Sequence, residues 1–155
     1  MKKVSVLAAL LLTMCLVQYA PAQTNGDSLK VARSAVQAER LELIAANLNL
    51  SESESAIFWP LYREYRTALD QANDKRVDLL VRYFASHETL TDEEAISLLN
   101  EHLAWKKEVL TIHTSYAKKM NKVLPGKVVA RFFQIENKMD TIVEYEMASD
   151  IPLVK

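Results

Sequence analysis

The stretch from Leu90 to Leu124 constrains the fold most, because it is long and contains neither glycine nor proline. Apolar positions recur along it at steps of three and four, the period of one face of an α-helix: Ala95, Leu98, His102, Trp105, Val109, Ile112, Tyr116, Met120 and Val123. Thr91 and Glu94 have the spacing of a capping box at its start, and Pro125 marks its end. A helix of roughly 50 Å, at about 1.5 Å per residue, cannot bury this face alone. Another segment or a second chain must therefore cover it.

A second long helix is expected before this stretch, beginning at Ser51. Ser51 and Glu54 repeat the capping box, and apolar side chains follow at helical steps as far as Phe84. Pro60 interrupts the pattern, and because proline lacks a backbone donor and clashes with the preceding turn, we expect a kink or a short break there. The polar connection at residues 86–89 is short enough to join two antiparallel helices.

Two further helices complete the pattern. One begins near residue 27 or 28 and fades at Asn47–Asn49, and the other begins at or just after Pro125 and ends near Ser149. Residues 150–155 contain a proline and form a tail that is either extended against the body or loose. No strand pattern competes, so the sequence predicts an all-α fold of four helices with a long antiparallel α-hairpin.

The first 22 residues have the pattern of a secretory signal peptide. A basic start precedes an apolar run from Val4 to Val17, and Ala20-Pro21-Ala22 is a small-residue cleavage signal. The apolar run is short for a membrane span. Met14 before Cys15 does not fit a lipoprotein signal, which needs a small residue there. We therefore expect cleavage after Ala22 and a single helical domain over residues 23–155, located in the periplasm.

Composition excludes several classes of function. Cleavage would remove the one cysteine, Cys15, so no disulfide framework and no catalytic thiol would remain. The chain has no glycine-rich phosphate loop and no G-x-S-x-G motif, and its formal net charge is −1. The sequence therefore predicts no enzyme and no cofactor, and it argues against nucleic acid as a partner.

His102 and His113 are the two candidate metal ligands. Their spacing places them on nearly the same side of one helix but about 16 Å apart, so a shared metal would need ligands from a second helix or chain. The alternative is a hydrogen-bonded histidine in the seam between helices. The position of His102 between Leu98 and Trp105 favours that alternative. The sequence thus predicts no metal site.

A basic segment lies around the end of the third helix. No acidic residue occurs between Glu108 and Glu136. One interpretation is a solvated turn whose cations stabilise the helix end. The other is a surface for anionic partners or unfolded chains, supplemented by neighbouring aromatic rings. The candidate client-binding residues are Lys118, Lys119, Lys122, Lys127, Arg131, Phe132 and Phe133.

The two capped helix starts, residues 50–54 and 90–94, resemble the repeated LTxxQ motif of the Spy/CpxP family. These are exported, all-helical stress-response proteins of the Gram-negative periplasm. Phe58-Trp59-Pro60 and the segment from Lys122 to Arg131 resemble a subgroup whose members mostly lack an assigned function. In this chain Glu54 and Glu94 replace the glutamines of the motif, and a capping box accepts either residue.

The resemblance implies an antiparallel, cradle-shaped homodimer that binds unfolded or misfolded envelope proteins without ATP, on a concave apolar and basic surface. It implies no catalytic residue. The alternative is a sensor or signalling accessory for envelope stress or metals, which would bind a membrane-bound stress regulator. A structural partner in an envelope assembly is the third hypothesis.

Overall fold

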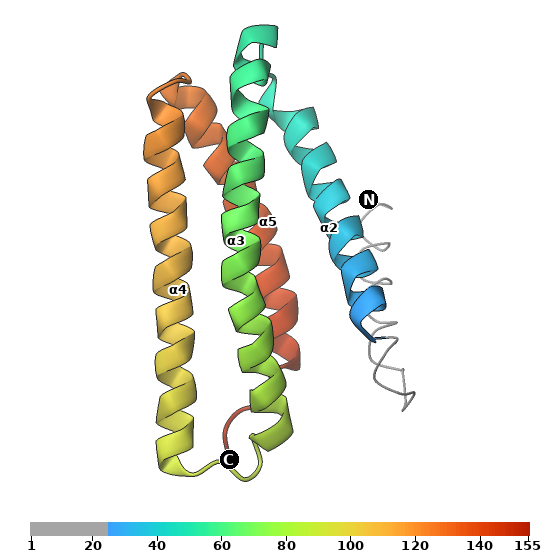
Figure 1. The fold of residues 1–155 in the computed structure, drawn as a ribbon, viewed down its shortest axis with the longest axis vertical. Coiled ribbons are helices and arrows are strands. Elements are labelled where there is room, and N and C mark those ends of the chain that lie inside the picture. Colours follow the sequence, from blue (N-terminus) through green and yellow to red (C-terminus); the bar gives the residue numbers. More distant parts are fainter. Residues whose placement is uncertain (1–24) are drawn as a thin grey trace. The chain divides into compact units, whose positions relative to one another are not determined.

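The computed structural model describes the backbone from Asn25 onward and side chains from Val36 onward. The predicted signal peptide, residues 1–22, lies outside the described residues. The described residues form helices α2 (Asn25–Leu48), α3 (Glu52–Ser86), α4 (Asp92–Asn121) and α5 (Gly126–Asp150), without a strand (Figure 1). The predicted all-α class is confirmed for this part of the chain.

The chain divides into two compact units between Glu42 and Leu43. The second unit, residues 43–155, contains the last turn of α2 together with α3, α4 and α5. Asn49 follows α2 with a φ of 50°. This left-handed conformation, which asparagine tolerates, ends the helix.

Capping boxes begin both long helices. The Ser51 hydroxyl accepts a hydrogen bond from the backbone N–H of Glu54, and the Glu54 carboxylate accepts one from the Ser51 N–H at 2.8 Å. Thr91 and Glu94 repeat the arrangement at α4, with 2.9 Å for the return bond. These backbone hydrogen bonds lower the pKa of both glutamates. The local sequence therefore fixes where α3 and α4 begin.

The short break considered at Pro60 does not occur, because α3 runs without interruption from Glu52 to Ser86. Proline at this position leaves the carbonyl of Ala56 without its helical donor. Both Ala56 and Pro60 are exposed, so water can satisfy that carbonyl. The cost of the missing hydrogen bond is thereby reduced, and the helix continues.

Helices α3 and α4 lie side by side in opposite directions, and exposed ion pairs join them along one edge (Figure 1). The edge is formed by Glu64 with Lys119, Lys75 with Glu108, and Arg82 with Glu101. Exposed pairs of this kind each contribute little to stability, about 0–1 kcal/mol. The packing of apolar side chains must therefore supply most of the stability.

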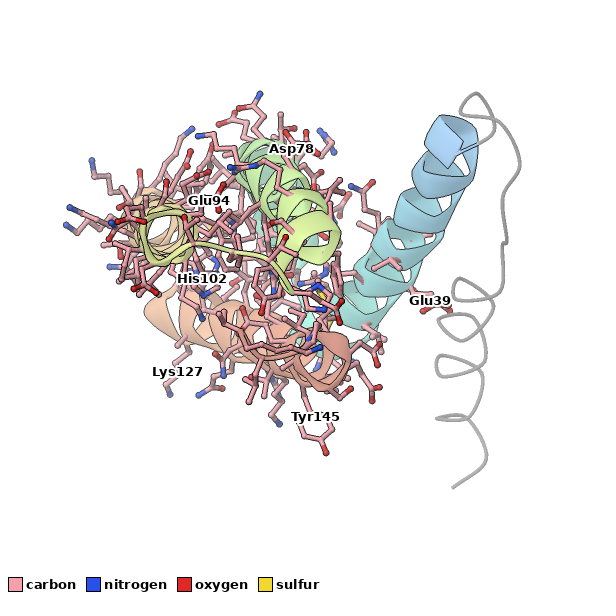
Figure 2. The ribbon with its side chains drawn as sticks, turned by 90° about the horizontal axis from the view of Figure 1, so that it is seen from below. Glu39, Asp78, Glu94, His102, Lys127 and Tyr145 are labelled. Carbon is pink, nitrogen blue, oxygen red and sulfur yellow. The ribbon has the colours of Figure 1, made fainter. Side chains whose placement is uncertain are left out.

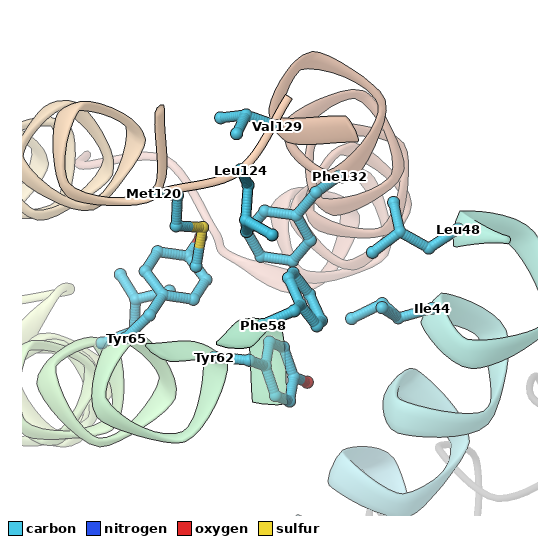
Figure 3. Close-up of a cluster of buried hydrophobic side chains, with 10 residues drawn as sticks. Ile44, Leu48, Phe58, Tyr62, Tyr65, Met120, Leu124, Val129 and Phe132 are labelled. Atoms are coloured by element: carbon cyan, nitrogen blue, oxygen red, sulfur yellow. The ribbon is translucent and has the colours of Figure 1, made fainter. Parts of the chain in front are cut away.

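The core lies where α4 connects to α5. Phe58 and Tyr65 of α3 pack edge-to-face on Phe132 of α5, with ring centroids 5.2 and 5.6 Å away. Ile44 and Leu48, from the last turn of α2, cover the same cluster (Figure 3). The other buried members are Tyr62, Leu69, Met120, Leu124 and Val129.

A buried carboxylate links α5 to α3 beside this core. Glu136 is 1 % exposed, accepts a hydrogen bond from the Tyr65 hydroxyl at 3.2 Å, and lies 3.4 Å from Arg66 Nη1. Burial, followed by the charge of Glu136, raises the pKa of Tyr65 well above its usual value. Tyr65 therefore stays protonated and continues to donate this hydrogen bond.

The tail after α5 is extended and packs against α3, which is the first of the two predicted arrangements. The backbone of Ile151 is extended, and the Tyr83 hydroxyl donates a hydrogen bond to the Pro152 carbonyl at 2.6 Å. Lys155 pairs with Glu88 at 2.8 Å. The tail thus reaches the end of α3 that lies far from the aromatic core.

Candidate functional site

The predicted basic residues all lie on the surface, around the α4–α5 connection. Lys119 pairs with Glu64 of α3, and this partner raises the pKa of Lys119. The other four cations form no ion pair with a described residue: Lys118, Lys122, Lys127 and Arg131. Lys127 extends away from the helices in Figure 2. The basic surface is therefore present, and most of its charge is available to an anionic partner.

The two phenylalanines assigned to the same surface are placed differently. Phe132 is fully buried in the core, so it cannot contact a client in this conformation. Phe133 is half-buried against Tyr65 and His113, with centroids 5.8 and 6.1 Å from its ring. The aromatic part of the predicted client surface therefore belongs mainly to the core, because α5 turns this side toward α3.

A second apolar face of α4, which we call the α4 stripe, is exposed instead. It consists of Ile96, Leu99, Leu103 and Leu110, which are between 49 and 65 % exposed. Their spacings of three, four and seven residues place them on one side of the helix. The pattern predicted a single apolar face on this helix, and the spacing of these four residues is the signal that would have indicated a second one.

A smaller exposed set occurs on α3, in the C-terminal half of that helix, which leads into the α3–α4 connection. Val77, Val81 and Phe84 are between 36 and 64 % exposed and are spaced four and three residues apart. Except for Leu110, which lies past the middle of α4, both exposed sets lie toward the α3–α4 connection, away from the aromatic core. The two helices therefore present apolar surface at the end that the core does not reach.

An apolar cavity of about 250 Å³ opens between α3, α4 and the tail at this same end. Its aliphatic walls come from these three elements and from the α3–α4 connection: Leu79, Leu80, Leu90, Ala95, Leu98, Leu99, Ile151 and Val154. Tyr83, Arg76 and His102 contribute the polar groups. Leu99 belongs both to the cavity and to the α4 stripe, so the exposed face continues into the cavity.

Two polar residues of the cavity lining, Arg76 and His102, lie against the ring of Trp105. The guanidinium of Arg76 lies 4.4 Å from the ring centroid of Trp105, and the ring of His102 lies 5.5 Å from it. Glu144 of α5 lies 4.0 Å from Arg76 and 3.9 Å from Lys106. Arg76 of α3 and His102 of α4 thus lie against one ring, and Glu144 of α5 joins this group through Arg76 and Lys106.

The same surroundings disfavour the charged form of two of these side chains. Burial lowers the pKa of Arg76, and nearby Glu144 opposes that change. Burial, followed by the charges of Lys106 and Arg76, lowers the pKa of His102. The lowered pKa favours the neutral form of the His102 imidazole in the cavity wall.

The two candidate metal ligands lie in different environments. His102 faces the cavity, whereas His113 packs between Tyr65 and Phe133, and its buried Nε2 forms no hydrogen bond with a described residue. From residue 36 onward, no group of three histidine, cysteine, aspartate or glutamate side chains is close enough together to hold a metal ion.

Comparisons with protein-family models, with curated proteins and with solved structures find no match for this chain. Among the described helices, none combines the length and the apolar character that a membrane span requires.

Proposed function

We propose that the protein is an ATP-independent, chaperone-like protein of the Spy/CpxP type, which binds unfolded or misfolded envelope proteins in the periplasm. The observation that carries this proposal is the α4 stripe, an apolar helix face whose side chains remain between 49 and 65 % exposed beside an apolar cavity. Contiguous exposed apolar surface of this kind is characteristic of sites that bind other chains.

Apolar and charged surfaces would act together in client binding. The α4 stripe and the cavity would contact apolar segments of a client, whereas Lys118, Lys122, Lys127 and Arg131 would attract acidic segments from a distance. Attraction between exposed charges is screened at a Debye length of about 8 Å in physiological salt. Binding should therefore weaken with salt in proportion to the charge contribution, and the apolar contribution should persist.

The proposal includes a homodimer in which two α3–α4 hairpins form a cradle, as the family resemblance implies. The exposed sets on α3 and α4 support it, because a protomer with uncovered apolar faces gains stability when a second copy covers part of them. Sedimentation equilibrium of the chain from Gln23 to Lys155 checks this part. A monomer at micromolar concentration would remove the dimer from the proposal without removing client binding.

The decisive test is suppression of aggregation. Chemically denatured malate dehydrogenase is diluted into buffer with the chain from Gln23 to Lys155, and light scattering is followed. We expect scattering to fall with increasing protein and without ATP. Absence of any effect at several-fold molar excess would overturn the proposal, and capture of one stoichiometric membrane regulator would favour the signalling accessory instead.

A pair of variants locates the surface. Leu99→Ser combined with Leu103→Ser removes apolar area from the α4 stripe and should at least halve the suppression. Val123→Ser is the matched control, because Val123 is 51 % exposed but lies at the opposite end of the hairpin. Equal loss in both variants would assign the activity to general surface hydrophobicity rather than to the stripe.

A further inference from the structure

The tail Ile151–Lys155 already shows how a peptide sits on the cavity. Its backbone is extended at Ile151, and its Pro152 carbonyl accepts the hydrogen bond from the Tyr83 hydroxyl. Ile151 and Val154 line the cavity, whereas Leu153 is 88 % exposed. Ile151 and Val154, three residues apart, therefore face the helices, whereas Leu153 between them faces solvent.

The fit of the tail is incomplete. About 250 Å³ remains between the tail and the helices, so part of the aliphatic wall has no contacting atoms and loses dispersion energy. Val154 remains 51 % exposed. The ion pair of Lys155 with Glu88 is exposed on both sides and contributes little. The tail is thus held by a few weak contacts on a site with room for larger side chains.

We propose that this groove is the client-binding pocket, that it accepts an extended client segment with aliphatic side chains three residues apart, and that Ile151–Lys155 occupies it as a displaceable plug. This inference rests on the proposed function and deepens it. The groove supplies apolar walls for two side chains, the Tyr83 hydroxyl for a backbone carbonyl, and the Glu88 carboxylate for a cation.

The plug sets the selectivity of the pocket. Because the tail is joined to α5, it competes with a client at the high effective concentration of an intramolecular ligand, on the millimolar scale for short connections. A client segment displaces it only when larger aliphatic side chains fill the free volume and gain more contact than Ile151 and Val154 do. Folded proteins, which do not offer such segments, leave the plug in place.

The test uses a fluorescein-labelled peptide with the sequence of residues 149–155, whose binding is measured by fluorescence anisotropy. The receptor is the chain from Gln23 to Lys155, either unchanged or with Ile151→Ser and Val154→Ser, which weaken the plug. The control is Leu153→Ser, which changes the same tail at a position outside the cavity. We expect the double variant to bind the peptide at least tenfold more tightly than either of the others.

Two substitutions in the helices show where the peptide binds. Added to the double variant, Tyr83→Phe removes the hydroxyl that contacts Pro152 and should weaken peptide binding several-fold. Ala95→Phe places a ring in the cavity and should abolish binding. Circular dichroism establishes that each variant keeps its helical content. Tyr83→Phe could reduce binding by disturbing the packing of the helices. Ala95→Phe only fills free space, so it tests the pocket independently of such a disturbance.

Each result has a separate meaning. Equal peptide affinity for all three receptors overturns the plug, and binding that survives Ala95→Phe overturns the pocket. If the double variant binds the peptide but does not reduce aggregation of the client, the result supports the pocket and counts against the proposed function. Aggregation suppressed equally by the unchanged chain and the Ala95→Phe variant supports the proposed function and overturns the pocket. A dimer that forms only in the double variant would assign the groove to a second copy.

Discussion

The two ends of the α3–α4 pair differ in how they are covered. At the end where α4 connects to α5, the last turn of α2 and the start of α5 add side chains, and rings such as Phe58 and Phe132 are buried. At the end where α3 connects to α4, the five-residue tail lies over the helices, and a cavity remains between them. Phe84, at this second end, is 47 % exposed.

This difference teaches that burial here depends on the number of covering elements rather than on the apolar content of the helices. Both ends carry aliphatic and aromatic side chains at helical spacing. Where several helices meet, these side chains pack against one another and stabilise the fold. Where coverage is thin, the same residue types remain available to another chain. Mutations at the two ends should therefore change the free energy of unfolding by unequal amounts.

The largest expected effect is loss of the ring at the covered end. Phe132→Ala should lower the free energy of unfolding by about 3–5 kcal/mol, because it removes a fully buried ring and leaves a cavity. Ile96→Ala, at a position 57 % exposed near the α3–α4 connection, should change it by no more than about 0.5 kcal/mol. Urea unfolding followed by circular dichroism measures both. Similar losses would show that the two ends are packed alike.

Replacing alanine by the larger leucine should have opposite effects on stability at a packed and an unpacked site. Ala72→Leu, at a fully buried position of α3, should cost about 1–3 kcal/mol through overpacking. Ala95→Leu, which extends into the cavity, should be neutral or should stabilise by about 0.5–2 kcal/mol. Thermal unfolding of both variants gives the comparison. A loss of stability in Ala95→Leu equal to that in Ala72→Leu would mean that the cavity is closed in solution.

The helix caps should contribute equally at the two ends, because they act locally. Ser51→Ala and Thr91→Ala each remove a side-chain acceptor at a helix start and should each cost about 1 kcal/mol. The double variant should show the sum within about 0.5 kcal/mol, since the sites share no partner. Urea unfolding tests this additivity. A large departure from the sum would show that the helix starts are coupled.

The smallest expected effect is a pH dependence that arises at the thinly covered end. Burial lowers the pKa of His102 in the folded chain below the ordinary value of 6.5, with Lys106 and Arg76 adding to the effect and Glu144 opposing it. Between the folded and unfolded values the unfolded chain binds more protons, so stability falls as the pH drops below about 6.5.

Unfolding measured between pH 7.5 and 5 checks this sign. His102→Gln should flatten part of the slope, and His87→Gln controls for the loss of a histidine in the connection between α3 and α4. An identical slope with and without His102 would exclude it as the source.

Helix boundaries could be predicted from the sequence wherever a local signal exists. The capping boxes at Ser51 and Thr91 define the starts of α3 and α4, because their hydrogen bonds involve residues only three positions apart. Pro125 likewise marks the start of α5. At Pro60 the local signal allowed for a break that does not occur, because the helix is exposed there and water reduces the cost of the missing hydrogen bond.

The candidate site was less predictable, because burial depends on contacts between distant residues. Phe132 and Phe133 are neighbours with the same side chain, yet only the first lies wholly inside the core. The exposure of the α4 stripe could not be predicted, because Leu99 and Leu103 follow the same period as the buried face beside them. Periodicity identifies apolar faces, but it does not tell which face a third helix will cover.

The ion pairs between α3 and α4 have a consequence for the alignment of the two helices. Along α3 the paired residues advance by eleven and then seven positions, and along α4 their partners go back by the same steps: Glu64 with Lys119, Lys75 with Glu108, and Arg82 with Glu101. A slip of one turn, about four residues, would set Lys75 opposite Ala104 or Ile112. No pair would survive such a slip, so contacts that contribute little to stability still select a single register for the hairpin.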